Sequence, residues 1–182
     1  MIVKNTGIEG LKIIQPKKYE DHRGYFFESF NKSEYEKAGI HANWVQDNQS
    51  KSMYGVIRGL HYQVSPHAQA KLVRVLSGLI YDVAVDIRKD SPTFGQWHGL
   101  EISNENNLVF YIPEGFAHGF SVLSEEATVL YKCSVLYNPK AERGILFNDT
   151  VLGIDWCIPA GKMILTGRDK AFPEFSKAEM IF

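Results

Sequence analysis

Three short segments of the chain place reactive side chains among residues that are typical of buried strands. They are Arg58–Gln63 (RGLHYQ), Lys71–Val75 (KLVRV) and Pro113–Phe120 (PEGFAHGF). Histidine, lysine and arginine are side chains with which enzymes move protons and hold anions. Each segment also has an ordinary explanation: a strand histidine is often a hydrogen-bonded core residue, Lys71 suits a solvated sheet edge, and Pro-x-Gly makes a turn. These residues alone leave an active site and a structural role equally open.

The third segment resembles the second sequence motif of the cupin barrels, in which Pro-x-Gly-x-x-His precedes a strand. Metal-binding cupins add a His-x-His motif followed by a glutamate. Here Gln63 stands where the second histidine is expected, and Lys71 stands in place of the carboxylate. A cation there repels a divalent metal ion, and the usual set of N and O ligands is not assembled. The sequence therefore predicts a cupin-like barrel that uses no metal.

Alternating apolar residues predict the strands that position these segments. Residues 79–87 and 127–136 both have a period of two, which is typical of a strand with one drier face. Shorter strands are predicted at 44–48, 55–63, 70–76, 97–103, 107–112 and 118–123, with turn residues between them. Many short strands with little helix indicate an all-β protein. We predict one domain, residues 1–182, folded as a cupin-like jelly-roll barrel with a few short peripheral helices.

One helix near the start has clear boundaries. Asn31 can cap it, Glu34 can return the capping bond, and Phe30 and Tyr35 fall where a hydrophobic staple packs. Gly39 can end it in the left-handed conformation. A second short helix is expected within the last dozen residues, which are rich in Lys, Ala and Glu.

Composition excludes several classes of protein. The net charge is -1 and basic residues form no run, which argues against a sequence-independent nucleic-acid binder. No stretch approaches the roughly 20 apolar residues that span a bilayer, and the N-terminus has no secretory pattern. The two cysteines, Cys133 and Cys157, are expected to be free thiols in a reducing cytoplasm.

Six groups of residues, in order along the chain, resemble the dTDP-4-dehydrorhamnose 3,5-epimerase family. They are Asp21–Glu28, Gln46–Asn48, Arg58–Gln63, Pro113–Phe120, Leu130–Lys132 with Glu142–Arg143, and Asp169. The resemblance implies an isomerase in dTDP-L-rhamnose synthesis, which supplies cell-envelope polysaccharide. It inverts C3 and C5 of dTDP-4-dehydro-6-deoxy-D-glucose through an enolate, because the C4 ketone makes both carbons acidic. No redox cofactor or metal is required.

The family pattern assigns the catalytic roles. It makes His61 the base, with Asp169 as the carboxylate that fixes its tautomer and stabilises the imidazolium. Lys71 lies near the developing enolate oxygen, where one preorganised donor is worth roughly 3 kcal/mol. Tyr131 is the acid on the far face of the sugar. Without the family match, Tyr131 is better explained as an inward core aromatic.

The pattern also assigns contacts to the nucleotide and the sugar. Arg23 and Arg58 can fork onto pyrophosphate oxygens, which a guanidinium does better than an ammonium. The other expected substrate contacts are Glu28, Gln46, Asp47, Asn48, Lys71, His118, Glu142 and Arg168. Three aromatics are candidates for stacking on thymine: Phe26, Phe27 and Tyr137.

Two departures and one conflict accompany the match. Residue 168 is Arg where many relatives carry Lys, and Cys133–Leu136 is more apolar than expected beside the catalytic strand. An unbroken strand would put Arg58 and His61 on opposite faces, so we predict a bulge or twist at Gly59.

The resemblance further implies a homodimer in which an N-terminal portion joins the neighbour's sheet. Leu11–Ile14 could be that portion or an edge strand within one chain. Three alternatives stay open: an epimerase of C3 alone or of another single centre, a metal cupin such as an oxygenase, and a silent sugar-binding module.

Overall fold

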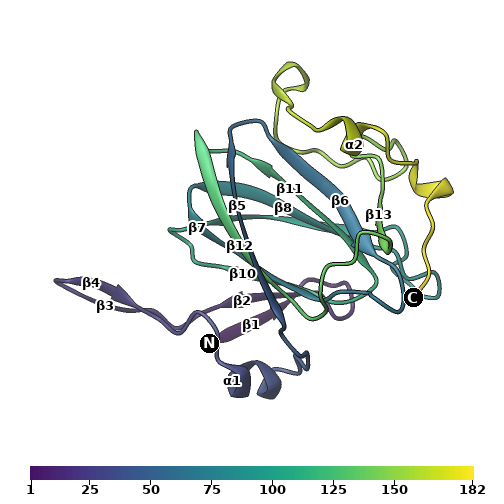
Figure 1. Cartoon of the computed structure of the whole chain (residues 1–182). Coiled ribbons are helices and arrows are strands. Elements are labelled where there is room, and N and C mark those ends of the chain that lie inside the picture. Colours follow the sequence, from purple (N-terminus) through teal and green to yellow (C-terminus); the bar gives the residue numbers. More distant parts are fainter.

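The computed structural model describes residues 1–182, and two antiparallel β-sheets face each other across its centre (Figure 1). The six-stranded sheet contains, in order, β1 (Ile2–Asn5), β2 (Lys12–Gln15), β10 (Val109–Ile112), β7 (Lys71–Ser77), β12 (Glu126–Cys133) and β5 (Gln46–Met53). The five-stranded sheet contains, in order, β13 (Glu142–Gly144), β6 (Ile57–Gln63), β11 (Phe116–Val122), β8 (Leu79–Asp86) and β9 (Trp97–Ser103). The all-β prediction is confirmed.

The central core lies between the two sheets. Val73 and Val129 of the six-stranded sheet pack there with Ile80, Phe116 and other inward residues of the five-stranded sheet. Strand β8 was predicted to have one drier face, but it is buried on both faces. The reason is a second core, in which Val83 and Val85 of the outer face are covered by residues from the C-terminal third of the chain, including Ile145, Leu152 and Trp156.

The predicted first helix is confirmed as α1 (Lys32–Lys37). The Glu34 amide donates to Asn31 Oδ1, Phe30 packs on Tyr35 with ring centroids 5.1 Å apart, and Gly39 has φ +74°. The Glu34 side chain pairs with Lys37 instead of completing the capping box. Tyr35 anchors the helix to the outer face of the six-stranded sheet.

The ends of the chain differ more from the predictions. The last dozen residues contain only a 3-10 turn, η2 (Phe175–Lys177), and the other short helices are η1 (Ala160–Lys162) and α2 (Gly167–Lys170). The predicted strand at 11–14 is β2, which pairs with β1 and β10 of its own chain. A hairpin of β3 (Tyr19–Asp21) and β4 (Gly24–Phe26) was not predicted, and it projects away from both sheets (Figure 1).

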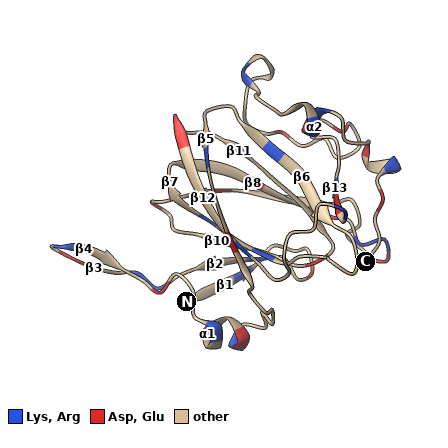
Figure 2. Cartoon of the chain, viewed as in Figure 1, with Lys and Arg blue, Asp and Glu red and all other residues tan.

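Charged residues of both signs are scattered over the elements and loops of the chain (Figure 2). None of the helices has the length and hydropathy that crossing a membrane requires.

Candidate active site

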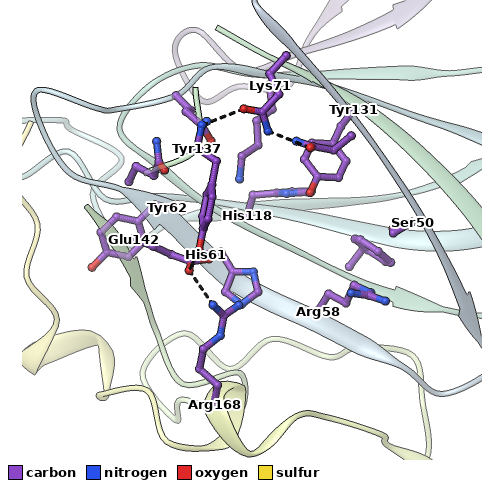
Figure 3. Close-up of a pocket in the computed structure, with 15 residues that line it drawn as sticks. Ser50, Arg58, His61, Tyr62, Lys71, His118, Tyr131, Tyr137, Glu142 and Arg168 are labelled. Carbon is purple, nitrogen blue, oxygen red and sulfur yellow. Dashed lines mark hydrogen bonds and ion pairs between the residues drawn. The ribbon is translucent and has the colours of Figure 1, made fainter. Parts of the chain in front are cut away.

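A pocket of about 370 Å³ opens between the two sheets, and most of the predicted site residues line it (Figure 3). These are Gln46, Asn48, Arg58, His61, Lys71, His118, Tyr131, Glu142 and Arg168. The pocket wall also includes Tyr137, one of the three candidates for stacking on thymine, and five residues that were not assigned as contacts: Ser50, Tyr62, Gln63, Gln69 and Phe120. The polar side chains converge because β5, β6, β7, β11 and β12 all turn one set of alternating residues inward.

His61 is held by a carboxylate from far along the chain. Its Nε2 lies 2.7 Å from Oδ1 of Asp169, a residue that α2 positions. Thr166 caps α2 by accepting from the Asp169 amide, and Phe172 packs edge-on against the imidazole at 5.5 Å. Burial would raise the pKa of Asp169, but the hydrogen bond with His61 and the His61 charge outweigh it, so the pKa is lowered. A carboxylate therefore faces the histidine at neutral pH.

A bulge in β6 turns both Arg58 and His61 toward the pocket, as the sequence predicted. His118 lies opposite His61 and Phe120 lies opposite Arg58, so three steps along β6 match two along β11. Gly59 has φ +138°, and a Cβ there would come within 2.5 Å of the Gly119 Cα atom. Only glycine fits this close approach of two strands. Arg58 is then fixed by donating from Nε to Ser52 Oγ at 3.0 Å.

Lys71 and Tyr131 come from the six-stranded sheet, across the pocket from His61. Tyr131 lies opposite Val73 of β7, two residues from Lys71. Burial lowers the pKa of the Lys71 ammonium, and the charges of Cys133, Asp82 and Glu142 act in the opposite direction. Burial raises the pKa of the Tyr131 phenol, which therefore keeps its proton at neutral pH. Lys71 makes no ion pair or hydrogen bond with another residue, so its ammonium is available to a ligand.

His118 is buried between the sheets on β11, and its Nε2 lies 2.8 Å from Oδ1 of Asp82 on β8. Burial lowers the pKa of His118, with the Asp82 charge opposing this. The pocket thus contains two histidines, each paired with its own aspartate.

The mouth of the pocket is bridged by three side chains (Figure 3). Oε2 of Glu142 accepts from the Tyr137 hydroxyl at 2.8 Å and from Arg168 Nη1 at 2.7 Å. The bond to Glu142 raises the pKa of Tyr137. Gln46 joins this group, since its Oε1 accepts from the Tyr137 amide and its Nε2 donates to Asn48. The mouth therefore offers a tyrosine ring beside a cation and amide groups.

Three predicted contacts are not brought into the pocket of this chain. Asp47 points to the opposite face of β5, where Lys132 donates to both of its oxygens at 3.0 Å, because neighbouring strand residues alternate. Arg23 lies at the tip of the hairpin, paired with Asp21, and Glu28 follows it and accepts from Asn31.

Asp82 is the residue of the site that the sequence analysis did not single out. It lies within the alternating segment 79–87, where a charged inward residue is an exception to the pattern. That exception is the signal by which it could have been found. Within the whole chain, no three His, Cys, Asp or Glu side chains are grouped as metal ligands.

Known proteins share both the sequence and the fold. Residues 5–177 match the family described as dTDP-4-dehydrorhamnose 3,5-epimerase. The enzyme of that name from Shigella flexneri is 49% identical, with 98% of each chain covered. The crystal structure from Elizabethkingia anophelis is 51% identical with a TM-score of 0.94, covering 97% of both chains. That from Legionella pneumophila, in complex with dTDP-4-keto-L-rhamnose, is 50% identical with a TM-score of 0.93, covering 97% of this chain and 93% of its own.

These matches extend over nearly the whole chain, and their structures share its two-sheet cupin fold. The chain belongs to the dTDP-4-dehydrorhamnose 3,5-epimerase family.

Proposed function

We propose that His61 and Tyr131 are the base and the acid with which this chain inverts C3 and C5 of dTDP-4-dehydro-6-deoxy-D-glucose. The enzyme is an isomerase of dTDP-rhamnose biosynthesis. Inverting a carbon requires that a proton leave one face of the sugar and return to the other. The observation that carries the assignment is that His61 and Tyr131 belong to different sheets and line one pocket. A pyranose ring between the sheets would have one of them on each face.

His61 suits proton abstraction because the free nitrogen of a neutral imidazole can accept a proton and later release it. Asp169 supports this role. A carboxylate 2.7 Å from Nε2 stabilises the imidazolium that forms when the proton is taken, and it fixes which nitrogen faces the sugar. Positioned proton transfer contributes on the order of 10²–10⁴-fold for each group.

Lys71 and Tyr131 complete the chemistry. When C3 or C5 loses its proton, negative charge moves to the oxygen at C4, and the unpaired Lys71 ammonium stabilises it. Tyr131 then returns a proton to the opposite face of the carbanion. Its raised pKa is no obstacle, because a carbanion is far more basic than a phenolate. His61 then gives its proton to solvent and Tyr131 takes one from it, and the two groups act in the same roles on the second carbon.

The polar mouth of the pocket suits the nucleotide. Arg58 and Arg168 can bind the pyrophosphate, and Tyr137, half exposed at the mouth, can stack on the thymine ring. Gln46 and Asn48 are placed to hydrogen bond to the base or the sugar. Relatives bind such ligands, since the Bacillus anthracis enzyme has TDP bound.

The deciding experiment incubates dTDP-4-keto-6-deoxyglucose with enzyme in D₂O and counts the exchanged carbons by NMR. We expect deuterium at both C3 and C5. Changing His61→Ala is expected to lower exchange at both by at least about 10³-fold, within the range for a lost general base, while dTDP affinity stays nearly unchanged. Undiminished exchange in this variant would remove His61 as the base.

The same experiment tests the alternative of C3-only epimerisation. A 3'-monoepimerase from Streptomyces bikiniensis is a more distant relative, at 34% identity and a TM-score of 0.86. Exchange at C3 alone would assign this chain to that activity.

The functional unit we propose is a cytoplasmic homodimer. Both cysteines are free, as suits a reducing compartment. The hairpin exposes Tyr25 at 57% and Phe26 at 67%, and large apolar side chains on an arm of this kind are typical of a surface that a second chain covers. Through such an arm, Arg23 and Glu28 would enter the partner's pocket. Arg23 carries the charge that a pyrophosphate contact requires, and Glu28 can accept hydrogen bonds from sugar hydroxyls or from the thymine N–H.

A further inference from the structure

Asp82 is buried inside the barrel with half of its hydrogen-bonding capacity unused. It is 0% exposed, and its Oδ1 accepts from the His118 ring. Its Oδ2 has no partner, which is true of only one other buried side-chain atom in the molecule, Ser50 Oγ. A buried carboxylate oxygen without a partner is costly, so its retention calls for a functional explanation.

The pairing fixes the tautomer of His118. An ionised carboxylate only accepts hydrogen bonds, so Nε2 of His118 must carry a hydrogen. Burial favours the neutral ring, which leaves Nδ1 without a hydrogen, as an acceptor. Nδ1 makes no bond to the protein, and His118 lines the pocket (Figure 3). The ring therefore offers an acceptor to whatever binds there.

Asp82 is also the anion without a cation in this part of the molecule. Glu142 and Asp169 both lie within 4.0 Å of the Arg168 guanidinium, whereas the only side chain paired with Asp82 is the His118 ring. Lys71, in contrast, is a cation without a partner. An isolated ammonium in such a place tends to lose its proton, and a nearby buried anion opposes that loss.

We propose that Asp82 is a positioning residue for the epimerisation: it holds His118 as an acceptor for a hydroxyl group of the sugar and supplies negative charge that stabilises the Lys71 ammonium. This inference rests on the proposed roles of the pocket residues. Asp82 does not touch the substrate, and it acts through the two side chains that do.

The tautomer is tested directly on the wild-type protein. Two-bond ¹H–¹⁵N spectra of protein labelled with ¹⁵N-histidine distinguish the two tautomers and the imidazolium, and a His118→Gln variant assigns the signal. We expect the Nε2–H tautomer at pH 7. An Nδ1–H tautomer or an imidazolium would overturn the proposal. This result does not depend on catalysis, so it is independent of whether the proposed base and acid are correct.

The effect on catalysis is tested with Asp82→Asn, which keeps the shape and removes the charge. We expect kcat to fall about 10- to 100-fold, because one electrostatic contribution is lost, while the Kd for dTDP stays within about twofold. Asp86→Asn is the matched control: it lies on the same strand, is also 0% exposed and pairs with Arg88 away from the pocket. It is expected to lower Tm and leave kcat within about twofold. A wild-type kcat in Asp82→Asn would overturn the proposal.

A double variant isolates the charge that acts through Lys71. If Asp82 works in part by stabilising the Lys71 ammonium, adding Asp82→Asn to Lys71→Met should lower kcat by less than it does in the wild type. If Asp82→Asn lowers kcat by the same factor in Lys71→Met as in the wild type, the two residues are not coupled and this part of the proposal is overturned. Should Asp82→Asn fail to fold, the spectra of the wild-type protein still test the tautomer proposed for His118.

Discussion

The Lys71 ammonium is a pocket charge without an ion-pair partner. Because burial lowers its pKa while burial raises that of Tyr131, Lys71 is the first of the two to lose its proton as pH rises. Activity should therefore fall on the alkaline side through the pKa of Lys71, below its usual value of about 10.4. Lys71→Arg should retain part of kcat and carry the activity plateau to higher pH, since a guanidinium stays charged. A pH profile of kcat for both enzymes checks this, and an unchanged alkaline limb would contradict it.

Asp169 acts at the acidic end of the pH range, and the property that it changes there is the stability of the fold. Its pKa is lowered in the folded protein, so its ionisation stabilises the fold above the unfolded value of about 3.9 and this contribution is lost as pH falls through the folded pKa. Asp169→Asn should make urea-induced unfolding less dependent on pH between about 5 and 2. It should also lower kcat by about 10²–10⁴-fold. Asp155→Asn, an exposed aspartate, is the control for both measurements.

The motifs that carry the family resemblance identified nine pocket residues before any fold was known, because these motifs carry the chemistry locally. They could not show that Asp47 turns outward, since that depends on the pairing of β5 with β12. They also could not pair Asp82 with His118, which is 36 residues away. Contacts made across a barrel depend on strand register, which a single sequence does not state.

The bulge in β6 can form only because residue 59 is a glycine. In Gly59→Ala, the added methyl group would meet the backbone of Gly119 at 2.5 Å and of His118 at 2.9 Å, in a backbone conformation that disfavours L side chains. We expect a loss of more than about 1 kcal/mol of unfolding free energy and a reduced kcat, because Arg58 and His61 lose their common direction. Gly161→Ala, where no atom lies within 4 Å, should change neither. Urea unfolding and steady-state kinetics measure both effects, and a stable, active Gly59→Ala enzyme would refute the role given to the bulge.

Strands with a clear run of alternation were predicted well, whereas the three-residue strands were missed and β5 was predicted only as far as residue 48. β8 and β12 have eight residues each, enough to display the period, whereas β3, β4 and β13 have three. The second core explains the other difference. Burial of the outer face of β8 depends on Trp156 and its neighbours, which lie about 70 residues further along the chain in irregular segments.

At the scale of the whole molecule, the residues that the family pattern assigns to one substrate site do not all lie at one place in a single chain. Nine of the predicted side chains line the pocket, while Arg23 is carried on a hairpin that points away from it (Figure 1). The two strands of the hairpin pair only with each other. Its aromatic side chains, Tyr25 and Phe26, are exposed to water, which is unfavourable for apolar surface. Exchange of the arms between two copies would complete each pocket and cover the aromatics, consistent with a two-fold symmetric dimer.

Subunit mixing tests this arrangement. Arg23→Ala is defective in the arm and His61→Ala in the pocket, so each homodimer should have little activity. After unfolding and refolding together, half of the dimers should contain both chains, and each of these has one pocket with an intact His61 that receives an intact Arg23 from its partner. Activity should recover to about a quarter of the wild-type value. If each arm served its own pocket, no mixture would regain activity. A light-scattering mass of one chain would contradict the dimer itself, whereas a dimeric mass without recovery would leave the association intact and assign Arg23 to the chain that carries it.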